Sequence, residues 1–127
     1  MILRIWRGWT TPDRADDYER LLNGTIAPAI MQRGLAGLHE LAVLRRDPKE
    51  DRDPKEDGNQ EEGDGEVEFM TLMTFDDRAA VAEFAGPDPA ASVVPPAARA
   101  VLARFDAHSQ HYEVIQRHRP AGFAEAP

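Results

Sequence analysis

Four segments of the chain carry apolar, β-branched and aromatic residues at the two-residue spacing typical of strands. They span residues 2–9, 38–45, 66–75 and 109–116. The third segment is the most regular, because every second residue points the same way: Val67, Phe69, Thr71, Met73 and Phe75. The pattern predicts four strands distributed over nearly the whole chain.

Between the first two strands, apolar residues recur at intervals of three and four, which predicts a helix. It begins at Thr11, a favoured N-cap residue, with Pro12 in the first helical position. Pro28 has no backbone N–H to donate to the carbonyl of Gly24, so we expect the helix to break or kink there. A further turn ends at Gly34.

Two more helices are predicted in the second half of the chain. One begins at Asp76, a capping residue, and stops at Gly86-Pro87, which cannot continue a helix. The other follows a pair of prolines and extends at helical spacing to Phe105.

The resulting order is β-α-β-β-α-β, with a short extra helix before the last strand. This is the ferredoxin-like, split-βαβ pattern. We expect a single α+β domain over residues 1–117, followed by a frayed tail over 118–127. Its four-stranded antiparallel sheet would have the first and third strands in the centre and both main helices on one face.

The other face of this sheet also needs a cover. Leu3 and Ile5 point to one side of the first strand. Ile2 and Trp6 point to the other, so one helical layer cannot bury both sets. The simplest second layer is another copy of the chain, packed sheet against sheet about a two-fold axis. We therefore expect a homodimer.

The net charge is concentrated in one segment. The chain has 127 residues and a formal charge of −8, and residues 47–68 hold eleven acidic against three basic side chains, which accounts for all of it. The segment contains a tandem hexapeptide, Arg46–Asp51 followed by Arg52–Asp57. Residues 47–65 include no large apolar residue, so this part of the chain cannot offset the entropy of ordering. We expect a disordered acidic hairpin loop over 47–65, and its spacing does not match a calcium loop.

The rest of the chain is neutral, which excludes several classes of function. Nucleic acid and anionic membranes are not expected as partners, because both require a basic face. The chain has no cysteine, so disulfides, thiolate chemistry and cysteine-ligated metals are excluded. No apolar run has the length of a membrane span, and the N-terminus lacks the features of a signal peptide. We expect a cytoplasmic protein.

No pattern of a metal or nucleotide enzyme is present. The four histidines form no i, i+4 ligand pair; they are His39, His108, His111 and His118. Phosphate-binding glycine loops, dinucleotide fingerprints and nucleophile elbows are absent from the sequence. We therefore expect neither a metal nor a bound cofactor.

Candidate pocket residues come from the strands and the second helix. Trp6 and Trp9 lie on opposite faces of one strand, so at most one can line a given pocket. Arg4 and Arg7 of the same strand can pair with carboxylates of neighbouring strands, Glu68 or Glu113, or anchor an anionic ligand. The pocket candidates are Trp6, Trp9, Arg7, Phe69, Met73 and Phe84.

Several stretches of the chain follow a known pattern in the same order. They are Ile5–Thr10 with Tyr18 behind it, Gly34–Gly37 before a strand, and a strand, cap and Ala-rich helix over Glu68–Phe84, closed by His111–Val114. Together they resemble the antibiotic biosynthesis monooxygenase (ABM) family of the dimeric α+β barrel superfamily. The set is typical of the fold more than of one activity.

The resemblance implies a homodimer whose sheets close into a barrel, with a pocket in each protomer between sheet and helices. Some members oxidise aromatic polyketides with molecular oxygen and no cofactor, and others degrade heme. The heme-degrading branch uses an Asn on the first strand, a Trp on the third and a His on the second helix. Residues 2–9, 66–75 and 76–105, respectively, lack these residues.

The leading interpretation is therefore a cofactor-independent monooxygenase acting on an aromatic, polyketide-like substrate. The alternative is a non-catalytic dimer of the same fold that binds a ligand or has a structural role. Whether the protein is an enzyme stays open at this stage.

His111 and Tyr112 are the candidate catalytic residues. The near-neutral pKa of histidine suits it to remove a substrate proton before oxygen attack, and a tyrosine hydroxyl can orient the substrate. Because Tyr112 and Val114 are the more apolar set, we expect them toward the helices and His111 toward the partner subunit. Antiparallel pairing of the last strand with the first would place residues 108–111 beside Gly8 and Trp9.

Overall fold

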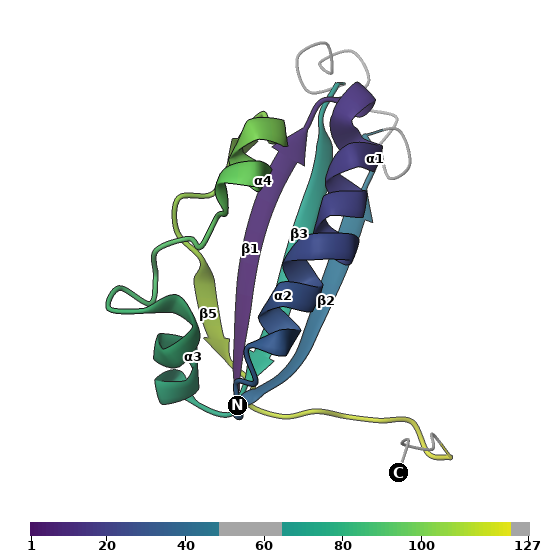
Figure 1. Ribbon diagram of the computed structural model, residues 1–127. Helices are drawn as coiled ribbons and strands as arrows, with labels where there is room; N and C mark the ends of the chain where they lie inside the picture. Colours follow the sequence, from purple (N-terminus) through teal and green to yellow (C-terminus); the bar gives the residue numbers. More distant parts are fainter. Residues whose placement is uncertain (49–64, 123–127) are drawn as a thin grey trace.

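The computed structural model describes residues 1–48 and 65–122, and Figure 1 shows their arrangement. The elements in chain order are β1 (Ile2–Thr10), α1 (Pro12–Leu21), the π-helical turn η1 (Leu22–Ile26), α2 (Ala27–Gln32), β2 (Leu38–Arg46), β3 (Val67–Phe75), α3 (Arg78–Ala85), α4 (Pro96–Val101), β4 (Arg104–Phe105) and β5 (Gln110–Glu113). Most of the predicted acidic loop, with its hexapeptide repeat, and the end of the predicted tail lie outside the described residues.

The sheet is antiparallel, with β1 and β3 in its centre. Its order is β2-β3-β1, and both β4 and β5 pair with the free edge of β1. β1 and β3 pair over their whole length, from Ile2 opposite Phe75 to Thr10 opposite Val67. The predicted α+β class and the central pair of strands are confirmed. The strand predicted over 109–116 is shorter and forms β5, whereas β4 lies in the segment predicted as a helix.

The helices lie on one face of the sheet, and α1 and α2 cross over β2 and β3 (Figure 1). The alternate β3 residues predicted to share a face do so, and they provide the centre of two buried clusters. One cluster contains Val67 and Phe69 against α1, η1 and α4. The other contains Met73 and Phe75 against α3. The period of two in β3 therefore fixes which side of the sheet carries the core.

The break predicted in the first helix is a π-helical turn. η1 widens the helix between α1 and α2, and Pro28 occupies the first turn of α2. A π turn changes the hydrogen-bond spacing, which accommodates a residue without a backbone N–H. Gly34 has a φ of +66° and ends this region, as predicted.

The predicted cap of α3 is wrong by one residue. Asp77 is the N-cap, and its carboxylate accepts a hydrogen bond from the backbone N–H of Ala80 at 2.9 Å. Asp76 instead contacts the ring of His39, and its backbone N–H donates to the carbonyl of Gly37. Two adjacent aspartates offer the same capping chemistry, so only the backbone path distinguishes them.

The helix predicted to extend to Phe105 ends at Val101. Phe105 lies in β4 opposite Gly8, and its ring centroid is 6.2 Å from that of Trp6. Pairing with a central strand and packing on an indole therefore outweigh the helical spacing of the sequence, a tertiary effect that propensity does not contain.

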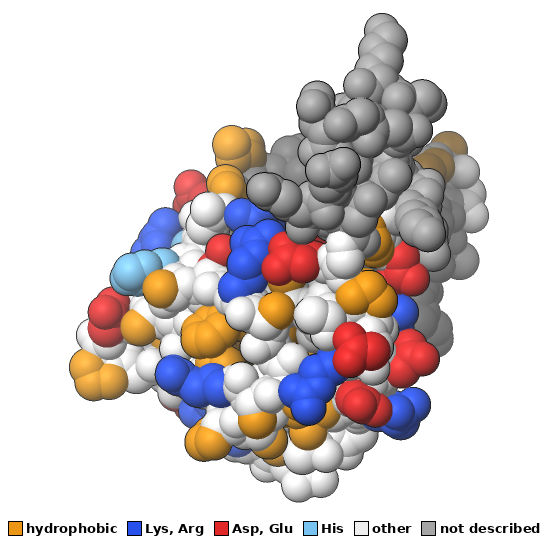
Figure 2. Space-filling view, turned by 90° about the horizontal axis from the view of Figure 1, so that it is seen from above, with side chains coloured by type: hydrophobic (Ala, Val, Ile, Leu, Met, Phe, Trp, Pro, Cys, Tyr) orange, Lys and Arg blue, Asp and Glu red, His pale blue; other side chains and the backbone are white. Residues whose placement is uncertain are grey.

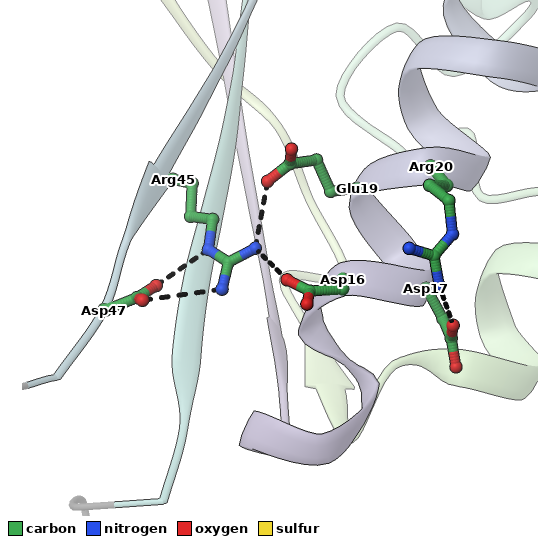
Figure 3. Close-up of polar contacts among 6 residues, drawn as sticks. All are labelled: Asp16, Asp17, Glu19, Arg20, Arg45 and Asp47. Atoms are coloured by element: carbon green, nitrogen blue, oxygen red, sulfur yellow. Dashed lines mark hydrogen bonds and ion pairs between the residues drawn. The ribbon is translucent and has the colours of Figure 1, made fainter.

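Arg45 joins α1 to the edge strand β2 (Figure 3). Its guanidinium donates to Asp16 and Glu19 of α1, each at 2.9 Å, and to Asp47 at 2.8 Å. These hydrogen bonds raise the pKa of Arg45 above its ordinary value. Because the group is near the surface, the network positions the helix more than it stabilises the fold.

Acidic and basic side chains are interspersed with apolar ones on the end of the molecule shown in Figure 2. This mixture agrees with a folded body that carries little net charge. Among residues 1–48 and 65–122, no helix has the length and apolarity needed to cross a bilayer.

Candidate functional site

A cavity of about 50 Å³ lies between the sheet and the helices. β1 and β3 form its floor, and the helical segments and the chain before α4 form its walls. The lining residues are Arg4, Trp6, Tyr18, Leu22, Ile26, Ala27, Ile30, Leu41, Thr71, Met73, Phe84, Val93, Val94, Pro95, Ala98 and Ser109. The lining is therefore mainly apolar, with a few polar groups, which is typical of small-molecule sites.

The size of the cavity limits what it holds without movement. It is about one third of the roughly 150 Å³ cavity that admits benzene. A carboxylate-sized group fits, whereas an aromatic ring requires a wall to move outward. Of the wall, the segment Val93–Pro95 and Ser109 lie outside helices and strands, and Val93 is 48% exposed.

Trp6 lies in the floor of the cavity, and two features fix its indole. Its Nε1 donates to the backbone carbonyl of Asp106 at 2.9 Å. A Cβ on Gly8 would come within 2.8 Å of the Trp6 ring, so only glycine leaves room for it there. The ring is therefore held by the strand that carries it and by the loop before β5.

Arg4 is a buried cation at the wall of the cavity. It is 3% exposed, and it donates to the carbonyls of Pro89 at 2.6 Å and Ala91 at 3.1 Å. The guanidinium also lies 5.3 Å from the ring centroid of Phe84. Burial lowers the pKa of Arg4, but a guanidinium still keeps its charge at neutral pH.

The predicted ion pair of Arg4 with a neighbouring strand is not formed. Neither Glu68 nor Glu113 contacts it, and among the described residues Arg4 has no carboxylate partner. Arg7 differs, because its Nε pairs with Asp106 at 3.2 Å. Of these two arginines, only the one that lines the cavity, Arg4, has no carboxylate partner among the described residues.

His111 lies beside Arg4 on the helix side of the sheet. Its Nε2 is 2.9 Å from Nη1 of Arg4. A guanidinium can only donate, so Nε2 accepts and the imidazole is neutral with its proton on Nδ1. Burial, followed by the charges of Arg4 and Arg78, lowers the pKa of His111. With Nε2 occupied by Arg4, His111 is placed to position that arginine.

The predicted register of the last strand is wrong, and so is the face of the sheet on which its side chains were expected. β5 pairs antiparallel with β1, but His111 lies opposite Arg4, and Gly8 lies opposite Phe105. His111 thus faces the helices and Tyr112 faces away from them. The more polar residue of the two is the inward one because Arg4 supplies it with a hydrogen-bond partner.

Tyr112 lies on the open face and does not line the cavity. It is paired with Leu3, is 52% exposed, and donates its hydroxyl proton to Gln110 at 3.2 Å. No cavity residue is among its partners, so the structure gives no support for it as a substrate-orienting group in this cavity.

The structure divides the predicted pocket residues into three groups: cavity-lining residues, Phe69 in the core, and Arg7 and Trp9 on the opposite face. Trp6, Met73 and Phe84 line the cavity. Phe69 is buried behind it, edge-on to Tyr18 with ring centroids 4.9 Å apart. The others are on the opposite face, where the guanidinium carbons of Arg7 and Arg104 lie 5.5 and 3.8 Å from the Trp9 ring centroid.

Three polar residues of the cavity are not among the predicted site residues: Tyr18, Thr71 and Ser109. Ser109 is 6% exposed, and its Oγ has no hydrogen-bond partner among the described residues. Tyr18 is buried, which raises its pKa above the ordinary value and keeps its phenol protonated at neutral pH. A single serine before a strand gives no sequence signal, although Ser109 has the same parity as His111.

The described residues contain no group of three histidine, aspartate or glutamate side chains that could hold a metal ion. No family model matches the chain, and no curated protein matches it. Its assignment to the ABM family is therefore a proposal, argued from the fold and the cavity.

Proposed function

We propose that this chain is a small-molecule-binding protein of the ABM type, whose ligand is a flat aromatic compound held in the cavity between sheet and helices. The observation that carries the proposal is the position of Arg4, a buried cation at the wall of an otherwise apolar cavity that also contains an indole. An apolar site with few fixed polar groups binds aromatic molecules and orients them.

The activity we propose is oxygenation of an electron-rich aromatic substrate without a cofactor. In this reaction an acidic C–H or O–H of the substrate is deprotonated, and the resulting anion reacts with O2 to form a hydroperoxide. Loss of water from a hydroperoxide at a methylene carbon leaves a carbonyl. Arg4 would stabilise the substrate anion, since a fixed cation in a poorly solvated site favours developing negative charge.

The roles of His111 and Tyr112 in this proposal differ from those expected from the sequence. His111 supports Arg4 through its Nε2 and keeps the guanidinium in place. Tyr112 is on the other face and takes no part in the cavity. The proton acceptor is then solvent or the substrate's own oxygen, with Arg4 lowering the pKa of the substrate.

The dimer is the second part of the proposal. The ferredoxin-like sheet would pair with that of a second copy through its open face, which carries Leu3, Ile5, Trp9, Ala42, Leu44, Met70 and Leu72. Leu44 and Tyr112 are 41% and 52% exposed, so large apolar groups of this face meet water in the monomer. Charged side chains border these residues, among them Arg7, Glu68 and Arg46. Exposed apolar residues with a polar rim are typical of an interface.

Oxygen uptake with anthrones and naphthols tests the activity. We expect uptake with the wild type, and much slower uptake with Arg4→Met at equal folded concentration. Binding without oxygen uptake would favour the alternative, a non-catalytic ligand-binding dimer. Absence of both binding and uptake for every compound would contradict the proposed function.

A further inference from the structure

Arg4 and Ser109 are held at the cavity by one short piece of chain. The carbonyls of Pro89 and Ala91 accept hydrogen bonds from the Arg4 guanidinium. The carbonyl between them, that of Ala90, accepts the backbone N–H of Ser109 at 2.8 Å. Three consecutive carbonyls therefore position both polar groups at the wall of the same cavity.

The guanidinium has hydrogen-bonding capacity left over. Of its five N–H groups, two on Nη1 serve Pro89 and His111, and one on Nη2 serves Ala91. The Nε–H and the second Nη2–H have no partner among the described residues. Nε and Nη2 share one edge of the guanidinium plane, the edge that binds a carboxylate through two parallel hydrogen bonds.

Ser109 adds a donor in the lining of the same cavity. Its Oγ is buried and unpartnered, although buried hydroxyls are almost always hydrogen-bonded. A hydroxyl can donate to an anionic oxygen, and a buried cation without a carboxylate is stabilised by the same anion. Both groups are thus complementary to one ligand chemistry.

We propose that the ligand carries a carboxylate, bound by the Arg4 guanidinium and the Ser109 hydroxyl, so that the substrate class is a small aromatic carboxylate. This inference rests on the proposed function, because it uses the same cavity. The carboxylate fills the space present in the structure, and the aromatic ring lies over Trp6 and displaces the Val93–Pro95 wall. Neutral and cationic analogues bind more weakly than the carboxylate because they leave the buried charge unpaired.

Calorimetric titration at pH 7.5 with two matched pairs of compounds tests this assignment: acetate against acetamide, and benzoate against benzamide. We expect each anion to bind at least about tenfold more tightly than its amide, the discrimination that a hydrogen bond to a charged group provides. Equal affinity for anion and amide would overturn the assignment and leave the proposed pocket intact.

Two variants test whether the Ser109 hydroxyl contacts the ligand. Ser109→Ala should weaken benzoate binding about fivefold to tenfold and leave benzamide binding unchanged. Thr10→Val is the matched control, since Thr10 is another buried hydroxyl without a partner among the described residues, and it does not line the cavity. It should alter neither affinity. An equal loss in both variants, or none in Ser109→Ala, would overturn the role of the serine.

The remaining outcomes separate this inference from the proposed function. Binding of acetate that depends on Ser109, without any binding of benzoate, would support the anion site and contradict the aromatic ligand. Absence of binding for all four compounds would contradict both. Arg4→Lys keeps the charge but loses the planar edge, and it should weaken benzoate binding more than Ser109→Ala does.

Discussion

Strand β1 places one arginine and one tryptophan on each face of the sheet, and the two pairs differ in burial and in their partners. On the helix side, Arg4 is buried without a carboxylate partner and Trp6 lines the cavity. On the open side, Arg7 is 41% exposed and paired with Asp106, and Trp9 lies under two guanidinium groups.

This comparison shows that residue type alone does not identify a site in this fold. The two arginines are three positions apart in one strand, as are the two tryptophans, and their sequence context is similar. What separates them is the layer of helices above one face, which removes water from Arg4 and leaves Arg7 solvated. Burial removes water as a hydrogen-bond partner, so a buried polar group is stable only if the protein or a ligand provides another partner.

The largest expected difference between the faces is in the cost of losing each arginine. Arg4→Ala removes the hydrogen bonds to the carbonyls of Pro89 and Ala91 and empties the space of a buried side chain, so we expect a loss of about 3 kcal/mol in the free energy of unfolding. Arg7→Ala removes a partly exposed ion pair and should cost less than about 1 kcal/mol. Urea denaturation of the two variants measures these free energies of unfolding. Equal losses would contradict the different roles of the two arginines.

The second prediction concerns the open face. Ile5→Glu places an unpaired charge in the proposed interface and should weaken dimerisation by about 100-fold, the effect of a desolvated charge without a partner. Ala82→Glu, at an exposed position of α3, is the control and should leave assembly unchanged. Sedimentation equilibrium measures both. A wild-type chain that stays monomeric at micromolar concentration would contradict the dimer.

The third prediction uses the titration of His111. Its pKa is lowered in the folded state from the ordinary value of about 6.5, so the unfolded chain binds a proton first as the pH falls. The free energy of unfolding is then constant with respect to this group above that value and decreases below it, by at most about 1.4 kcal/mol per pH unit. The decrease stops where the folded state also takes up the proton.

His111→Gln keeps an acceptor for Arg4 but cannot titrate. Urea denaturation of wild type and variant between pH 7.5 and 5 should give curves that diverge below pH 6.5, with the variant flatter. Curves that stay parallel would show that His111 titrates alike in both states, against the position assigned to it beside Arg4.

The smallest expected effect concerns the buried hydroxyl of Thr10. Thr10→Val replaces an unpartnered polar atom with a methyl group of similar size, so we expect stabilisation by about 1 kcal/mol. Thermal denaturation should show a higher midpoint. A lower midpoint would indicate that the hydroxyl has a partner, such as a bound water.

Much of the fold could be predicted from the sequence, because the spacing of apolar residues within each helix and strand is a local feature. The alternation from Val67 to Phe75 identifies the buried face of β3, and the proline at position 28 marks the irregular turn of the first helix. Phe105 was assigned to a helix because its strand pairing with Gly8 is a contact between distant residues. Such contacts leave no trace in a local period.

The site was less predictable, for a physical reason. Trp6, Met73 and Phe84 follow from apolar spacing, and they line the cavity. The apolarity of Tyr112 and Val114 predicts that His111 faces away from the helices, whereas its hydrogen bond with Arg4 holds it on the helix side. Ser109 is positioned by a hydrogen bond of its backbone N–H with the carbonyl of Ala90 in a loop. The path of a loop does not follow from the spacing of residues in the sequence.

An NMR titration that follows the indole N–H resonances of the two tryptophans, one on each face, tests the separation of ligand binding from assembly most directly. We expect benzoate to shift the resonance of Trp6 and leave that of Trp9 unchanged. Dilution of the unliganded protein through the dimer dissociation range should shift Trp9 and leave Trp6 unchanged. A benzoate response confined to Trp9, or both resonances moving together in both experiments, would contradict the assignment of ligand binding to one face and assembly to the other.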